Sequence, residues 1–324
     1  MPVLHRSHCD GRCGKAESVG NIVRKIIAAV VATGLLAAAG LGGWFYVQLT
    51  SYTQEQLSPD VYAIFGFGGI IGVLRTDAGT VLVDSMAMPM QGKRVRAMAE
   101  ELTGQPVVMV ISTHYHLDHT HGNPAMPADA RFVSSSATRR HLIATEPEFW
   151  EDNAPFIPNE TVDREQTFTI GNKSIRTLLP GRGHTDGDLV VLFVEDRVVH
   201  TGDLVFLGRY PNIDLEAGGS VREWAATLDE VARLDFDRAI PGHGPATDRQ
   251  GLQGFRAFID ELAEAGAHAA AQDWTLDETL ERTNLIHDAG MEDFTVPFIM
   301  HLDVDFVVQR SWEEATGTVT ARPH

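Results

Sequence analysis

The stretch "VVMVISTHYHLDHTHGN", residues 107–123, places four histidines and an aspartate directly after an apolar, β-branched run. Such a run predicts a buried strand, so the polar residues are expected in a loop at the carboxyl end of that strand. Side chains alternate along extended backbone, so His114 and His116 point to the same side and can converge on one ion. Asp118 and His119 are out of register with that pair, which favours a second ion beside the first.

Three other short polar turns border apolar runs of the chain. His184 lies in "GRGHTDGD", Asp203 ends "VVHTGD", and His243 lies in "IPGHG". Loops at the ends of several strands can aim their side chains into one cleft. Imidazole and carboxylate groups are the usual ligands of zinc in catalytic sites. Together with the histidine-rich loop, these turns predict a metal centre.

Several other residues that could take part in a metal site are weaker candidates. Tyr115 and His121 can hydrogen-bond behind the ligands, but a structural or exposed role is favoured for both, and His121 is expected to be a bystander. His200 is predicted to be packed or to lie behind the ligands, and His301 to belong to the core or the surface. The tail segment "HRSHCDGRC", residues 5–13, is interpreted as solvated chain in preference to a metal site.

Four motifs in order resemble the metallo-β-lactamase superfamily over roughly residues 58–310: H-x-H-x-D-H at 114–119, G-H-T at 183–185, T-G-D at 201–203 and P-G-H-G at 241–244. The resemblance implies an α/β fold, a four-layer αββα sandwich with the metals at one edge of its two sheets. It also implies a ligand set: His114, His116 and His184 for the first metal, Asp118, His119 and His243 for the second, and Asp203 between the two.

The activity implied by the resemblance is that of a dinuclear zinc hydrolase acting on a small-molecule substrate, with iron or manganese as possible substitutes. A hydroxide shared by two Zn²⁺ ions would attack an ester, thioester, lactone or amide carbonyl. Asp118 is the expected catalytic residue, because it is placed to orient the hydroxide and to take up its proton.

Two alternatives stay open. An aspartate at position 203 resembles the glyoxalase II and lactonase side of the superfamily, whereas β-lactamases more often have cysteine or serine there. A true β-lactamase is therefore an alternative and not the leading interpretation. The other alternative is a mononuclear iron sulfur dioxygenase of the same fold. His116 stands where flavo-diiron oxygen reductases would have glutamate, which argues against redox iron. A non-catalytic anchored scaffold is disfavoured, because the ligand set is complete.

Composition narrows the class of protein. The 324 residues are 44% hydrophobic, which indicates a globular chain with a substantial core. Residues 1–49 carry five basic and two acidic side chains, so the total charge of −18 leaves −21 on residues 50–324. That acidic body would repel a phosphate backbone, and nucleic-acid binding is not expected.

The uncharged run "IIAAVVATGLLAAAGLGGWFYVQL", residues 26–49, predicts a transmembrane signal anchor, since a helix of this length spans about 36 Å. Five basic residues precede it and none follows until Arg75, so residues 1–25 are expected in the cytoplasm. The predicted location is the bacterial inner membrane, with the catalytic domain facing the periplasm or exterior. A cleaved signal peptide, with Ala37 and Ala39 before the cut, is the alternative.

The remaining domain plan places a tether at residues 50–59 and the catalytic domain at 60–324. Strand and helix patterns alternate along that domain, as in an α/β fold. Residues 146–166 are expected to form a long ordered loop without regular elements. Strands are expected at 61–67, 70–76, 81–85, 107–112, 167–179, 188–194 and 197–201, and a further short strand is expected to end near Ile240. A strand–helix pair is expected at 131–145. Helices are expected at 89–103, 220–234, 246–271, 275–289 and 306–317.

Overall fold

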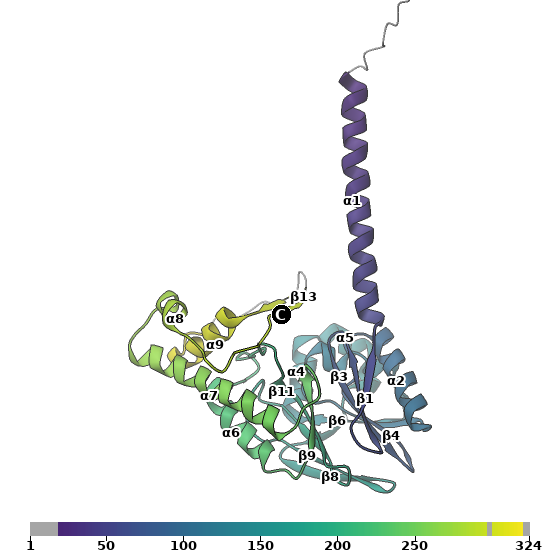
Figure 1. The fold of residues 1–324 in the computed structure, drawn as a ribbon. Coiled ribbons are helices and arrows are strands. Elements are labelled where there is room, and N and C mark those ends of the chain that lie inside the picture. Colours follow the sequence, from purple (N-terminus) through teal and green to yellow (C-terminus); the bar gives the residue numbers. More distant parts are fainter. Residues whose placement is uncertain (1–18, 297–299, 320–324) are drawn as a thin grey trace, which may run out of the picture. The chain divides into compact units, whose positions relative to one another are not determined.

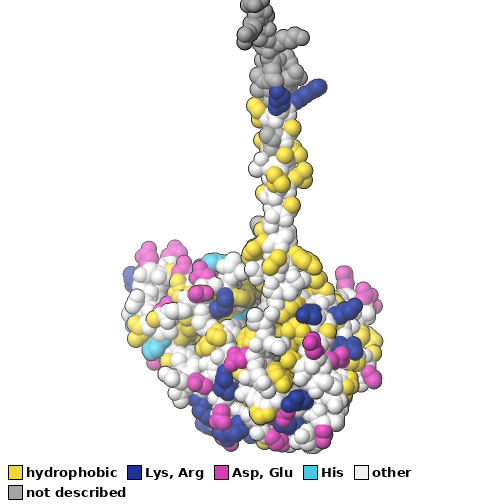
Figure 2. Space-filling model, turned by 45° about the vertical axis from the view of Figure 1, so that its right-hand side comes forward, with side chains coloured by type: hydrophobic (Ala, Val, Ile, Leu, Met, Phe, Trp, Pro, Cys, Tyr) yellow, Lys and Arg dark blue, Asp and Glu magenta, His cyan; other side chains and the backbone are white. Residues whose placement is uncertain are grey.

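The computed structural model describes residues 19–296 and 300–319, and the chain divides into two units between Leu49 and Thr50 (Figure 1). The described residues of the first unit lie in the helix α1 (Val19–Thr50). Apolar side chains cover this helix (Figure 2). Leu36, for example, is 74% exposed. From Arg24 to Thr50 the helix is long and apolar enough to cross a membrane. A signal sequence has the same length and apolar character.

The second unit is built on two mixed β-sheets. The first sheet has seven strands in chain order, antiparallel from β1 to β4 and parallel from β4 to β7. Its strands are β1 (Thr53–Gln56), β2 (Val61–Gly66), β3 (Gly69–Thr76), β4 (Gly79–Val83), β5 (Val107–Ile111), β6 (Arg131–Ser135) and β7 (Glu160–Val162).

The second sheet has five strands in the order β12-β11-β10-β9-β8, and only the pair β11–β12 is parallel. These strands are β8 (Glu165–Ile170), β9 (Lys173–Leu178), β10 (Val190–Phe193), β11 (Val198–Phe206) and β12 (Arg238–His243). A separate hairpin consists of β13 (Phe294–Val296) and β14 (Met300–Leu302).

Helices cover the outer faces of both sheets (Figure 1). Those of the second unit are α2 (Pro89–Thr103), α3 (Leu117–Thr120), α4 (Ser136–Thr145), α5 (Pro147–Asp152), α6 (Val221–Ala232), α7 (Arg249–Ala271), α8 (Leu276–Arg282) and α9 (Val304–Thr316), with 3₁₀ turns at Asn123–Ala125 and Ala154–Phe156.

The alternation of side chains along the strands makes the layers. In β2, Val61 and Ala63 face a core shared by both sheets, whereas Tyr62 and Ile64 face a second core that includes Val95 of α2. A third core packs the outer face of the second sheet against α6, α7 and α9. These three cores separate four layers, so the predicted αββα sandwich is confirmed.

Two sequence predictions are wrong in the N-terminal half of this unit. Residues 50–59, expected as a tether, contain β1, which adds an edge strand beside β2. Its residues are polar because backbone hydrogen bonds hold an edge strand without burying its side chains. Residues 146–166, expected as a loop, contain α5, a 3₁₀ turn and β7. Pro147 and Pro155 stand in the first turns of the two helical pieces, where a missing N–H costs nothing.

Three other predicted elements have different bounds. The strand expected at 167–179 is two strands, β8 and β9, because Gly171 takes a positive φ of 57° and turns the chain. The helix expected at 275–289 ends at Arg282. The helix expected at 306–317 begins two residues earlier, where Asp303 caps α9 by accepting from Phe306 N.

Candidate metal centre

The seven predicted ligands come together at one edge of the two sheets. His114 and His116 lie in the loop after β5, and Asp118 and His119 lie in the one-turn helix α3 that follows. His184 lies in the loop between β9 and β10, Asp203 in β11, and His243 at the end of β12. Their ligand atoms form two groups: His114, His116, His184 and Asp203, and Asp118, His119 and His243.

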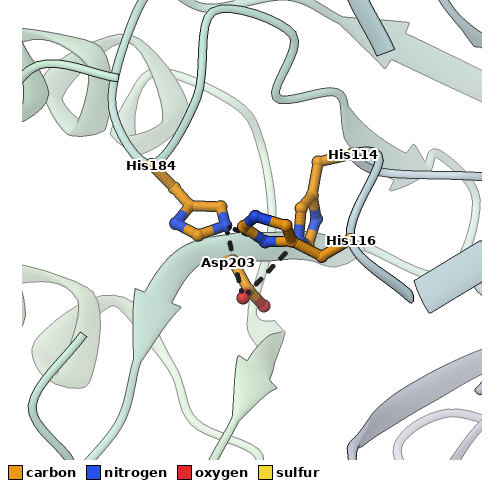
Figure 3. A group of neighbouring side chains, drawn as sticks. All are labelled: His114, His116, His184 and Asp203. Carbon is orange, nitrogen blue, oxygen red and sulfur yellow. Dashed lines mark hydrogen bonds and ion pairs between the residues drawn. The ribbon is translucent and has the colours of Figure 1, made fainter. Parts of the chain in front are cut away.

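In the first group the four ligand atoms all lie within 4.8 Å of one another (Figure 3). Nδ1 of His116 is 3.1 Å from Nε2 of His114 and 2.8 Å from Nε2 of His184. Oδ2 of Asp203 is 3.6 Å from Nε2 of both His114 and His184. Three ring nitrogens and a carboxylate thus converge on one point, as the i, i+2 spacing of His114 and His116 predicted.

The second group also lies beside Asp203. Oδ2 of Asp118 is 3.4 Å from Nε2 of both His119 and His243. Oδ1 of Asp203 is 3.2 Å from Nε2 of His119, and its Oδ2 is 3.3 Å from Nε2 of His243. One carboxylate therefore lies within ion-pair distance of imidazoles of both groups.

Two buried polar atoms indicate whether these residues are suited to bind a metal. Within the described part of the chain, Nε2 of His119 and Oδ1 of Asp203 make no hydrogen bond, although they lie 3.2 Å apart. A buried polar atom without a partner costs about 1–3 kcal/mol, so such atoms need a reason. Both point into the ligand groups, and nitrogen and carboxylate oxygen donors suit zinc. The residues present fit a bound metal.

The surroundings set the charge of the ligands. Burial lowers the pKa of His184 to about 4 and the pKa of His114 well below its ordinary value, so both rings are neutral at pH 7. Burial would also lower the pKa of His116 and His119, but nearby carboxylates outweigh it and raise both. Burial would raise the pKa of Asp203, but the surrounding imidazoles hold it well below the ordinary value. Metal binding at these rings would therefore displace protons.

A buried carboxylate fixes His119 from behind. Asp84 accepts a hydrogen bond of 2.7 Å from Nδ1 of His119, and it also accepts from the backbone N–H of Thr113 at 2.7 Å and from its hydroxyl at 2.9 Å. The backbone of Asp84 has a φ of +67°, which is uncommon outside glycine. The Nδ1–H bond leaves Nε2 with its lone pair toward the second group.

The first group has its own supports. Oδ2 of Asp214 accepts from Nε2 of His116 at 3.0 Å and from the hydroxyl of Tyr115 at 2.5 Å. Nδ1 of His184 donates to the carbonyl of Asn212 at 2.9 Å. These bonds select the tautomers that leave Nδ1 of His116 and Nε2 of His184 free to bind a metal.

Comparison with known proteins identifies the family of this fold. The sequence profile of the metallo-beta-lactamase superfamily matches residues 66–243, more than half of the chain. The chain belongs to the metallo-beta-lactamase superfamily. As a member of this superfamily it is a metal-dependent hydrolase.

Superfamily relatives share about a quarter of the residues. Metallo-beta-lactamase type 2 of Bacillus cereus is 27% identical over 179 residues, which are 55% of this chain and 67% of that protein. The 2,4-dinitroanisole O-demethylase subunit alpha of Nocardioides sp. (strain JS1661) is 26% identical over 178 residues, which are 53% of each protein.

Solved structures extend the likeness in fold. A metallo-beta-lactamase from Pontibacter korlensis covers 64% of this chain and 99% of its own length, at a TM-score of 0.54 and 22% identity. The sec-alkylsulfatase Pisa1 from Pseudomonas sp. covers 82% of this chain with half of its own length, at a TM-score of 0.67 and 13% identity. At these identities the likeness concerns the superfamily fold alone.

Three further histidines that the sequence singles out, all among the described residues, lie outside both ligand groups. His121, expected to be a bystander, stacks on Phe149 and pairs with Glu146 at 2.9 Å. His200 is buried and donates from Nε2 to the carbonyl of Ile70 on the facing sheet. His301 lies exposed on β14. The tail segment 5–13 lies outside the described residues.

The supporting residues Asp84, Asn212 and Asp214 were not expected from the sequence. Asp84 ends the apolar run "VLVD", which is the signal that singled out Asp203, so the same rule applied here would have found it. Asn212 contributes a backbone carbonyl, and Asp214 lies in an irregular loop nearly a hundred residues beyond His116. Nothing local in the sequence marks these two.

Proposed function

We propose that this metal-dependent hydrolase is a dinuclear zinc enzyme that cleaves an ester, thioester, lactone or amide. The observation that carries the proposal is the position of Asp203. Its carboxylate lies between two ligand groups, within 3.6 Å of imidazole nitrogens in both. A shared carboxylate of this kind supports two ions side by side and not one.

The chain's own residues supply the rest of the chemistry. When bound, a pair of zinc ions lowers the pKa of water at the site to about 7 and polarises the substrate carbonyl. Among the carboxylates of the two groups, Asp118 is the more exposed, with 22% of its side chain accessible against 4% for Asp203. Nearby imidazoles hold the pKa of Asp118 below its ordinary value against the effect of burial, so it is ionised. Asp118 is thus able to orient an attacking water and accept its proton.

Metal analysis of the full-length protein, coupled to a substrate panel, tests the proposal. We expect about two equivalents of zinc and turnover of one class among thioesters, lactones, esters and β-lactams. His116→Ala should lose metal and activity, whereas His301→Ala, which changes an exposed histidine outside both groups, should keep both. One equivalent of iron, with oxygen consumption on persulfides and no hydrolysis, would instead identify the dioxygenase alternative.

β-Lactam hydrolysis is the second candidate, supported by the type 2 metallo-beta-lactamases among the relatives. Position 203 argues against it, because β-lactamases of the superfamily more often have cysteine or serine there. The β-lactam arm of the substrate panel decides between the two. Turnover of β-lactams faster than of thioesters or lactones would make this chain a β-lactamase.

We also propose that α1 anchors the enzyme in a bacterial inner membrane, with the catalytic domain facing the periplasm or exterior. The 27 residues from Arg24 to Thr50 would span roughly 40 Å as a helix, more than the 30 Å of a hydrocarbon core. Basic residues precede the apolar segment, which favours a cytoplasmic N-terminus.

The two cysteines of the chain test the anchor, since Cys9 and Cys13 both precede the apolar segment. An uncleaved anchor retains both thiols, and a membrane-impermeant maleimide should label them only after the cells are lysed. A mature protein without any reactive thiol would show that the segment is cleaved. Labelling in intact cells would reverse the proposed orientation.

A further inference from the structure

Two ligands of the first group depend on one irregular segment. Residues 212–220, which we name the support loop, form the last part of the connection between β11 and α6 and contain no helix or strand. The carbonyl of Asn212 holds Nδ1 of His184, and the carboxylate of Asp214 holds Nε2 of His116. Irregular loops are ordinarily the more mobile parts of a fold. The precision of these two bonds therefore requires that something hold the support loop.

The C-terminal helix α9 holds the support loop on both sides of Asp214. Arg310 donates from Nε to the carbonyl of Ile213 at 3.0 Å, and its guanidinium pairs with the carboxylate of Glu216. The same guanidinium pairs with Glu313 of its own helix at 2.6 Å.

The end of the support loop has a second attachment to α9. The hydroxyl of Ser220 donates to Glu314 at 2.5 Å, and the backbone N–H of Arg222 donates to the other oxygen of Glu314 at 3.1 Å. Ser220 also caps α6. The support loop is thus attached to α9 at Ile213, Glu216 and Ser220.

Burying an arginine is costly, which makes the position of Arg310 informative. Its side chain is fully buried, and Glu313 beside it is almost so. Removing a charged pair from water costs several kcal/mol per ion, and such pairs often add little net stability over apolar packing. One attested use of a buried ion pair is to fix a single conformation. Here the conformation that it fixes is that of the loop beneath two metal ligands.

The second ligand group has different supports. Among the described residues, Asp118, His119 and His243 make no hydrogen bond or ion pair with residues 212–220 or with α9. His119 is held by Asp84, which follows β4 of the other sheet. A loosened support loop would therefore affect the first group and spare the second.

We infer that Arg310 is a positioning residue for the first metal: it acts through the support loop and sets metal affinity at His116 and His184 without touching either. This inference rests on the proposed function, because it requires that the first group bind a metal. It concerns a helix beyond residues 66–243, the part that matches the superfamily profile.

The test is zinc affinity of the full-length protein, measured by competition with a chromophoric chelator. Loss of a supporting partner typically costs 10–100-fold in metal affinity, so Arg310→Met should cost about tenfold in one of the two equivalents. His116→Ala identifies which equivalent belongs to the first group. The other equivalent should keep its affinity.

Ser311→Ala is the matched control, because Ser311 is buried on the same helix but donates to Leu262 of α7 and not to the support loop. This variant should lose stability and keep both affinities. Equal affinity losses in the two variants, or an equal loss at both equivalents of Arg310→Met, would reduce Arg310 to a general stabiliser and overturn the inference. If Arg310→Met does not fold, Glu216→Gln weakens the same attachment from the loop side and should lower the same affinity.

A crystal structure of the Arg310→Met or Glu216→Gln variant separates this inference from the proposed function. We expect the distance from Oδ2 of Asp214 to Nε2 of His116, now 3.0 Å, to lengthen. An unchanged distance overturns the inference whether or not the protein binds zinc. A wild-type protein without zinc overturns the proposed function, while this distance still decides whether α9 positions the support loop.

Discussion

The two ends of the sandwich's strands hold buried charge in different ways. At the end opposite the ligands, Lys173 pairs with Asp60 at 2.7 Å and with Asp196 at 2.8 Å. Ser58 donates to the remaining oxygen of Asp196, and Arg75 pairs with Asp60. The charges at this end are thus neutralised by other groups of the protein, as buried charges in a stable fold usually are.

At the end that holds the candidate ligands, the buried polar groups are not all paired with other groups of the protein. His119 and Asp203 each keep a buried atom without a hydrogen bond, and three ring nitrogens of the first group point at one another. The difference separates a structural ion cluster from a functional one. The first is complete within the chain, whereas the second becomes complete only when it binds something else.

Replacing the shared carboxylate should have the largest effect. Asp203→Asn removes the negative charge that faces both groups, so both metal equivalents should weaken. Because bound metal supplies several kcal/mol of transition-state stabilisation, we expect kcat/KM to fall on the order of 10³-fold. Activity assays with metal analysis measure both effects. A variant that keeps two tightly bound equivalents would show that Asp203 does not link the groups.

Asp118→Asn should have the next largest effect. The amide can no longer accept a proton, and loss of a general base typically costs about 10²-fold or more in kcat. Because His114, His116 and His184 are unchanged, the first equivalent of metal should remain bound. Steady-state kinetics and metal stoichiometry check the two halves of this prediction. Unchanged kcat would remove Asp118 from its proposed catalytic role.

The supports behind the two groups allow a paired comparison. Asp84→Asn should weaken metal binding at the second group by roughly 10–100-fold, and Asp214→Asn should do the same at the first. The two variants act on different imidazoles, His119 and His116, so their effects should fall on different equivalents. Chelator competition measures both affinities. If each variant weakens both equivalents alike, the groups are not independently supported.

Whether the role of a residue could be predicted from the sequence depends on whether a local motif or a distant contact determines that role. The seven candidate ligands could be predicted because each lies in a motif beside an apolar strand, and the structure brings all seven together. The four layers followed from the resemblance carried by those motifs. By contrast, Asp214 and Arg310 act through contacts nearly a hundred residues away in sequence, and no local pattern encodes such a partner.

The errors in secondary structure have a similar cause. The polar strand β1 is held by pairing with β2, and its own residues do not favour a strand. The segment 146–166 contains short helical pieces whose Trp150 is buried in a small cluster with Tyr115 and Leu142. Tertiary packing decides such segments, so periodicity within them is too weak to predict their structure.

The smallest effect is expected at the opposite end of the strands. Lys173→Met removes the charge that pairs Asp60 with Asp196, and hydrogen bonds to charged groups contribute about 1–3 kcal/mol to the free energy of unfolding. Metal content and kcat should stay at wild-type values, because Lys173 lies far from both ligand groups along the strands. Urea denaturation measures the loss of stability. A change in metal content would contradict the separation between the two ends.

The pH dependence of that loss sharpens the test. The hydrogen bond from Lys173 lowers the pKa of Asp60 below its ordinary value of 3.8, so its contribution is present above that pH and is lost as pH falls below it. The pKa of Lys173 is raised above 10.5, because its two carboxylate partners outweigh burial, so its contribution is present below that pH and is lost as pH rises through the folded value. The stability difference between wild type and Lys173→Met should therefore be constant between about pH 5 and 9 and shrink outside this range. A difference that persists undiminished at pH 3 would mean that Lys173 stabilises the fold by packing, and the two ends would then differ less in their electrostatics than the distances indicate.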